Sequence, residues 1–397
     1  MDTLFYLGFI FVFGAFIKMF CQKIKILYVV GYLIFGYLIG PNVFNIIPKS
    51  FIYESNIITE LSLSIISVLV GSSLKYKSLK SLSKQISLIS FFEAIVTFCL
   101  VSIAFYLLLS TMSLFNTKED IAVALLFGGL AIATAPATIL AIIHELEPKK
   151  RIQQILLGIV ALDNAFALII FSLILALSTF ILGEQNNILS SIFEIFPKFI
   201  FSIIIGVLGG LITNFIDKLY IKTQTLKTTS TLGMVFIVFS ICNNYNLEPL
   251  LATLVMGITM ANVSKEFALV KEEFDNHLKD IIFLLFFTFS AMHMKLELIY
   301  KMPWIIVTYV LFRSLGKFFG TRLGANISHA HIDAQKYLGL ALFPQAGIAI
   351  GLALSIQEIG SLKDVAPIIL DVIIATTIIH ELIGPVFTKY AIKKTQK

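Results

Sequence analysis

The stretch ATAPAT, residues 133–138, interrupts an apolar run that extends from 120 to 144. Pro136 lacks a backbone donor and frees the carbonyl oxygen four residues earlier, so it kinks or breaks a helix here. A second stretch of this kind, FPQAG at 343–347, lies inside the apolar run 336–356. Two such breaks at corresponding places in two halves of a chain are typical of discontinuous helices that cross near the middle of a membrane.

Both breaks lie in a series of long apolar segments. The chain has 397 residues, of which 58% are hydrophobic and 14% charged, with a mean hydropathy of +0.93. A soluble domain has about a quarter of its residues charged, so the composition excludes an ordinary globular enzyme and indicates an integral membrane protein. The segments are far longer than barrel strands and do not alternate, which excludes a β-barrel. Helical spans are predicted at 3–20, 27–47, 56–74, 85–110, 120–144, 154–182, 197–217, 229–244, 247–263, 279–296, 302–325, 336–356 and 365–388.

Thirteen spans can be divided into six, a linker span and six more. A six-span unit that follows a seventh helix is inverted relative to the first, as in many secondary transporters. The two breaks then fall in the fifth span of each unit. We therefore predict an all-α membrane protein of about 13 helices with two inverted six-helix repeats. Its discontinuous helices are expected to cross at Ala135, Pro136, Pro344 and Gln345, with helix ends facing an ion site.

Basic residues are distributed unequally between the two sets of loops. One set holds 22 of the 30 and the other set six, while Arg313 and Lys317 lie within the eleventh span. Cytoplasmic loops carry an excess of Lys and Arg, so we expect the N-terminus outside and the C-terminus inside. The first span has no basic region before it and is expected to be retained. The compact chain, without eukaryotic tails, favours a prokaryotic plasma membrane.

Ionisable side chains at membrane depth are costly and are functional candidates by default. Asp163, followed by Asn164, lies roughly half a bilayer deep in the sixth span, in GIVALDNA at 158–165. Lys317 lies deep in the eleventh span, with Arg313 one turn earlier. Neither Asp163 nor Lys317 has an opposite charge within its own turn. We expect them to pair with each other or to face water.

Several of these positions have a second interpretation. An Asp163–Lys317 pair could be a fixed salt bridge that only holds two helices together. Asn164 is either a ligand through its carbonyl oxygen or an interhelical hydrogen bonder. Glu93 and Glu381 are secondary candidates, each on a proton path or a satisfied interior residue. Arg313 either positions a helix or neutralises Glu381.

Resident metals and cofactors are not expected. The three cysteines are far apart in the sequence, and no Cys or His spacing of a metal site occurs.

The order of these features resembles the monovalent cation:proton antiporter superfamily, in its sodium(potassium)/proton exchanger domain, over essentially the whole chain. The stretches that carry the resemblance are Tyr28–Tyr32 with Gly40-Pro41, Ala133–Thr138 with Glu145, Leu157–Asn164, Lys317–Gly320 with Gly324-Ala325, Pro344–Gly347 and Glu381–Pro385.

The resemblance implies a homodimer that works by an elevator-like movement of a core domain. In that arrangement 1–82 holds scaffold and dimerisation helices, and 83–183 holds three core helices. The segment 184–301 holds the linker helix and further scaffold helices. The segment 302–397 completes the core and ends in a short cytoplasmic tail.

The site implied by the resemblance combines the acidic pair, Thr134 of the unwound helix and the basic Lys317. Proton and transported cation (Na⁺, K⁺ or Li⁺) would compete for the Asp163 carboxylate. The family pattern has its indispensable acid at the second position of the pair, whereas this chain has Asp163-Asn164. With a single carboxylate, electroneutral exchange of Na⁺ or K⁺ for protons is expected, in the service of pH homeostasis.

Two alternatives keep the fold and change the function. Asn164 in place of the second acid would suit a regulator or sensor that does not exchange ions. A sodium-coupled solute symporter of the same fold is the other, although the buried charge of Lys317 favours proton-coupled exchange. An intramembrane enzyme is not expected, because no catalytic motif of a hydrolase or metalloprotease occurs.

Overall fold

A computed structural model describes most of the chain, in the ranges 3–24, 26–48, 51, 56–76, 80–112, 116–183, 188–264, 266–292, 303–345, 347–356, 362–363 and 365–395. Some positions lie outside the described residues: Ala346 of the second break, the predicted domain limits at 184 and 301, and seven of the basic residues counted above, namely Lys25, Lys49, Lys77, Lys265, Lys295, Lys301 and Lys397.

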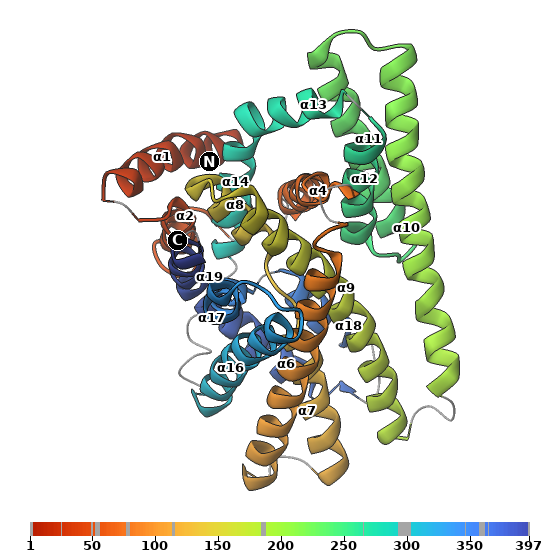
Figure 1. The fold of residues 1–397 in the computed structure, drawn as a ribbon. Coiled ribbons are helices and arrows are strands. Elements are labelled where there is room, and N and C mark those ends of the chain that lie inside the picture. The colour runs from red at the N-terminus through yellow and green to blue at the C-terminus, as the bar shows by residue number, and fades with distance from the viewer. Residues whose placement is uncertain are drawn as a thin grey trace. The chain divides into compact units, whose positions relative to one another are not determined.

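Within these described ranges, all regular secondary-structure elements are helices (Figure 1). Within them, seven helical stretches are long and apolar enough to cross a membrane, judged by length and composition. They are α1 (Thr3–Lys23), α6 (Ser83–Met112), α7 (Thr117–Ala131) with α8 (Pro136–Leu146), α9 (Lys150–Ile181), α10 (Ile188–Leu219), α11 (Gln224–Asn244) and α19 (Ala366–Thr395). Shorter apolar helices are α2 (Tyr28–Ile39), α4 (Asn56–Ser72) and α12 (Pro249–Val263).

The chain divides into two compact units. The first comprises 1–81 and 196–293, and the second comprises 82–195 and 294–397. In the first unit, α4 and α12 approach closely at Gly71 and Gly257, where a Cβ atom would collide with the backbone of the facing helix. Small residues at such positions let membrane helices pack backbone to backbone.

The segment between α12 and the next long helix in the first unit is helical rather than extended. It contains α13 (Phe267–Glu273) and a π-helical turn, Phe274–Leu278, that runs directly into α14 (Lys279–Met292). The residues from Phe267 to Met292 therefore form one continuous helical stretch.

The second unit holds both helix breaks. It contains α6, α7, α8, α9 and α19, together with α16 (Pro303–Ile327), α17 (Ile332–Tyr337), the 3-10 turn η2 (Leu338–Leu342) and α18 (Gly347–Ser355). An apolar core between α6, α7, α9, α16, α18 and α19 surrounds the breaks, and includes Phe105, Phe127 and Phe171.

Two predicted spans differ from the observed helices. The span at 27–47 ends at Ile39, because Gly40 and Pro41 terminate the helix and the residues that follow form turns, with Asn45 at a positive φ of 49°. The span at 336–356 consists of η2 and α18 on either side of the second break, with α17 ending just inside its first residues.

Candidate functional site

The two helix breaks meet in the second unit. The first separates α7, which ends at Ala131, from α8, which begins at Pro136. The second separates η2 from α18 and contains Pro344. The backbone N–H of Ala135 donates to the carbonyl oxygen of Pro344 at 3.1 Å. The two breaks are therefore adjacent at Ala135 and Pro344, two of the four residues expected at the crossing.

Arg313 of α16 joins the two breaks through its guanidinium group, which is fully buried. Nε donates to the carbonyl of Ala131 (3.1 Å), and Nη2 to those of Ala133 (2.8 Å) and Pro344 (3.4 Å). Nη1 donates to the carbonyl of Phe343 at 2.7 Å. The C-terminal end of a helix leaves carbonyl oxygens without helical partners and carries a partial negative charge. Arg313 donates hydrogen bonds to such oxygens and brings a positive charge beside them, so it positions the broken helices.

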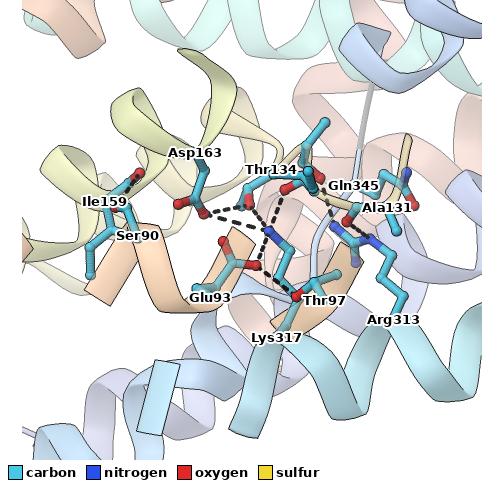
Figure 2. Close-up of polar contacts among 12 residues, drawn as sticks. Ser90, Glu93, Thr97, Ala131, Thr134, Ile159, Asp163, Arg313, Lys317 and Gln345 are labelled. Carbon is cyan, nitrogen blue, oxygen red and sulfur yellow. Dashed lines mark hydrogen bonds and ion pairs between the residues drawn. The ribbon is translucent and has the colours of Figure 1, made fainter. Parts of the chain in front are cut away.

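Lys317, one turn further along α16, lies at the centre of a buried cluster of charged and polar groups (Figure 2). Its Nζ lies 2.5 Å from Glu93 Oε1 and 3.5 Å from Asp163 Oδ2. It also donates to Thr134 Oγ1 at 2.8 Å and to the carbonyl oxygen of Ile132. A single ammonium group therefore contacts two carboxylates and the first helix break, and all three charged side chains are 0% exposed.

Asp163 and Asn164 of α9 hold the break from the opposite side. Thr134 Oγ1 donates to Asp163 Oδ2 at 3.0 Å, and the Thr134 N–H donates to Asn164 Oδ1 at 3.3 Å. Thr97 Oγ1 donates to Glu93 Oε1 at 3.1 Å. The second oxygen of each carboxylate, Asp163 Oδ1 and Glu93 Oε2, is buried and has no hydrogen-bond partner among the described residues.

Glu93 reaches this cluster because α6 and α16 approach backbone to backbone. Glycines recur at every fourth residue of α16, at 316, 320 and 324. A Cβ atom at Gly320 would lie 2.7 Å from the Cα of Glu93, closer than any side chain allows. The other two glycines contact α6 in the same way, at Thr97 and Ile89. This four-residue repeat is a signal of close helix packing, and it could have shown that Glu93 lies beside Lys317.

Besides Arg313, the second break contains the neutral side chain of Gln345. Gln345 Nε2 donates to the carbonyl of Leu130 at 3.2 Å and to the hydroxyl of Tyr309 at 2.8 Å. Glu381 of α19 is 0% exposed, and neither of its carboxyl oxygens has a partner among the described residues. Arg313 is bonded to carbonyl oxygens and does not neutralise Glu381. Of the two interpretations of Arg313, helix positioning is the one observed.

The structure brings four of the predicted residues together. Thr134, Asp163, Asn164 and Lys317 meet at the first break, as expected. The expected Asp163–Lys317 pair exists, but the closer partner of Lys317 is Glu93, which had been a secondary candidate. The structure does not test the roles of these residues in ion binding, and these roles stay predictions.

The charges that contact one another in the cluster do not balance, and Arg313, the other buried cation of α16, bonds carbonyl oxygens and neither carboxylate. Lys317 supplies one positive charge against the two carboxylates of Glu93 and Asp163. A buried negative charge without a counter-ion is costly. Either a proton or a monovalent cation would remove the excess, and the two would compete for the same carboxylate oxygen. Each of the two carboxylates has one oxygen free for this purpose.

The sequence matches a known transporter family, and the fold matches solved structures. The sequence profile described as sodium/hydrogen exchanger, transmembrane, matches residues 8–389. A structure of the sodium proton antiporter MjNhaP1 from Methanocaldococcus jannaschii at pH 8 is 20% identical, with a TM-score of 0.68, over 99% of this chain and 96% of that chain. An electron-microscopy structure of the same antiporter gives 19% identity and a TM-score of 0.72, over 100% and 96%. Curated protein sequences give no match. The predicted antiporter fold is confirmed.

Proposed function

Because the chain belongs to the transmembrane sodium/hydrogen exchanger family, whose activity is cation/proton antiport, we propose that it exchanges one Na⁺ or K⁺ for one proton at the first helix break. The observation that carries this proposal is the unbalanced charge of the cluster, with Lys317 between Glu93 and Asp163. The site lacks one positive charge, which either ion can supply.

Asp163 is the carboxylate that we assign to the exchanged ion. Glu93 lies 1.0 Å nearer to Lys317 than Asp163 does (3.5 minus 2.5 Å), and it also accepts from Thr97. Glu93 is thus the better neutralised of the two acids. Both acids keep one unpartnered oxygen, but only Asp163 of the two lies against Thr134 of the break, where the backbone is not committed to a helix.

This assignment makes the exchange electroneutral. The Glu93–Lys317 pair has no net charge, so the site becomes neutral when Asp163 binds either one proton or one monovalent cation. The two loaded forms then carry the same charge through the membrane, and a voltage does no net work on the exchange. Asn164 contributes a neutral amide that holds Thr134 and adds no second titrating group.

Alternating exposure of the site to the two sides of the membrane requires one part of the chain to move, and we assign the moving and fixed parts to the two units. The second unit contains both breaks and every charged member of the cluster, and each unit is held together by its own contacts. This supports an elevator-like movement of the second unit as a core, with the first unit as the scaffold of a homodimer. On the distribution of basic residues we place the N-terminus outside, and the prokaryotic plasma membrane stays a prediction.

The experiment uses purified protein in proteoliposomes that contain a pH-sensitive dye. Na⁺, K⁺ or Li⁺ is added outside, with and without a valinomycin clamp on the membrane voltage. We expect a cation-driven change of internal pH that does not respond to voltage and is lost in Asp163→Asn. Asp371→Asn makes the same chemical change on α19, outside the cluster, and should retain exchange.

Other outcomes point to other functions. Full exchange in Asp163→Asn would overturn the assignment of this residue. A rate that changes with voltage would overturn electroneutrality while leaving antiport intact. If no cation moves protons between mildly acidic and alkaline pH, the regulator or sensor function suggested by Asn164 takes precedence.

A further inference from the structure

A second buried carboxyl group lies on the helix that passes the other break. α9 passes the first break and presents Asp163 and Asn164 to Thr134. α19 passes the second break, where a Cβ atom at Gly384 would lie 2.8 Å from the backbone nitrogen of Pro344. Each break is thus faced by one long helix of the second unit that carries an acid.

Glu381 lies on the face of α19 that turns toward the second break. Residues 377, 381, 384 and 388 are spaced at three, four and seven positions and share one helix face. Gly384 on this face contacts Pro344, and Thr388 Oγ1 donates to the carbonyl of Ala341 at 3.1 Å. The carboxyl group of Glu381 is therefore presented to the same side as these two contacts.

No described residue pairs with Glu381 to neutralise it. Both carboxyl oxygens and the neighbouring Thr377 Oγ1 are buried and unpartnered among the described residues. On its own helix, His380 bonds through Nδ1 to the carbonyl of Thr376 at 2.8 Å and contacts the ring of Tyr309 edge to face. A carboxylate in this setting would be a buried charge without a counter-ion, whereas the protonated acid buries only a hydroxyl and a carbonyl.

The elements packed against α19 do not supply a counter-charge either. On α16, Arg313 donates to four carbonyl oxygens and Lys317 lies between Glu93 and Asp163. The described residues of η2 and α18 have no titratable side chain. The remaining titratable groups on the packed elements, none of them paired with Glu381, are Tyr309, Arg322, His144, Glu145, Asp333, Lys336, Tyr337, Lys118, Glu119 and Asp120.

We propose that Glu381 is a second proton-binding site of the core, which carries its proton while α19 is packed against the second helix break. Loss of that proton leaves a negative charge at the contact between Gly384 and Pro344, and the contact must open to admit water. The site is separate from the exchange at Asp163, and the inference does not depend on the exchange activity proposed above.

Infrared spectroscopy of the purified full-length protein tests the protonation directly. At about pH 7, exposed glutamates with a pKa near ~4.3 are ionised. We expect a carbonyl band of a protonated carboxylic acid that shifts when the protein is labelled with ¹³C-glutamate. The band should be absent in Glu381→Gln and retained in Asp163→Asn. A missing band, or a band that survives in Glu381→Gln, would overturn the proposal.

Glu381→Asp keeps a carboxyl group and covers the case in which Glu381→Gln does not fold. Its band should persist but no longer shift with labelled glutamate, and a remaining shift would identify a different glutamate. Hydrogen–deuterium exchange then tests the link to packing. Corrected for the intrinsic effect of pH, amide exchange in η2 and α18 should rise in alkaline solution for the wild type and not for Glu381→Gln. An equal rise in both proteins would contradict that link.

Discussion

The two helix breaks of the second unit have similar backbones and different side-chain surroundings. Each break has backbone carbonyl oxygens that accept hydrogen bonds from Arg313. The two breaks meet where the backbone N–H of Ala135 donates to the carbonyl oxygen of Pro344. The first break is surrounded by two carboxylates and an ammonium group. The second is bonded through the neutral amide of Gln345, and the acid that faces it, Glu381, has no cationic partner in the part of the chain that the structure describes.

The difference teaches that a broken helix does not by itself make an ion site. At the second break the protein's own groups satisfy the amide nitrogen of Gln345 and the exposed backbone. At the first break two buried carboxylates contact one ammonium group, and we propose that an ion from outside supplies the balance. Variants of the two breaks can therefore separate the effect of backbone geometry from the effect of charge.

The largest expected effect comes from Lys317→Met. The variant leaves Glu93 and Asp163 buried without a cation, and breaking a buried ion pair in this way costs about 3–5 kcal/mol. We expect a large fall of the unfolding temperature of the purified protein. Adding Glu93→Gln in the same chain should restore most of the loss. If Lys317→Met alone is as stable as the wild type, the charges of the first break do not stabilise the core.

Arg313→Met should have the next largest effect, and it acts on both breaks. It removes the donor of four carbonyl oxygens, but relaxation and water offset most of the loss, and we expect a net cost of about 1.5–3 kcal/mol, that of one hydrogen bond to a charged group. Arg313→Lys keeps the charge but cannot span both breaks, so it should recover less than half of the lost stability. Full recovery by lysine would mean that charge alone, rather than the planar fork, supports the crossing.

Glu93→Gln should change transport more than stability. Without Glu93, the ammonium group of Lys317 pairs with Asp163 alone, and it competes with the transported cation for the Asp163 carboxylate. We expect the cation concentration for half-maximal exchange to rise about tenfold, which corresponds to about 1.4 kcal/mol. The dye assay in proteoliposomes measures it. An unchanged half-maximal concentration would contradict the assignment of Glu93 as the partner that neutralises Lys317.

The smallest effect sharpens the comparison most directly. Thr134→Val removes a hydroxyl that bonds both Asp163 and Lys317, and a hydrogen bond of about 1 kcal/mol predicts about a fivefold weaker apparent cation affinity. Gln345→Met removes the corresponding polar group at the second break and should leave the affinity nearly unchanged. Equal losses in the two variants would place the ion between the breaks rather than at the first.

Much of this arrangement could be predicted from the sequence. Proline within an apolar run identified both breaks, because its missing N–H affects the backbone wherever it stands. Asp163, Thr134 and Lys317 could be found because charge at membrane depth and a broken helix are rare and costly. The end of the second span at Ile39 was missed, since apolar residues continue past the Gly40-Pro41 terminus.

The partners of the charged groups were harder to predict. Glu93 meets Lys317 only because α6 and α16 pack along the glycines at 316, 320 and 324, which is a contact between helices distant in the chain. Arg313 binds backbone carbonyl oxygens, and no side-chain pattern records where these will lie. Tertiary packing determines both partnerships, and a single sequence shows it only indirectly.

Proton release on cation binding is the most direct test of the account. Purified protein in a weakly buffered, mildly acidic solution receives Na⁺ or K⁺ while an indicator reports the pH. The account predicts release of one proton for each cation bound, lost in Asp163→Asn and retained in Asp371→Asn. Release that persists in Asp163→Asn, or cation binding without any proton release in the wild type, would contradict competition of the two ions for Asp163.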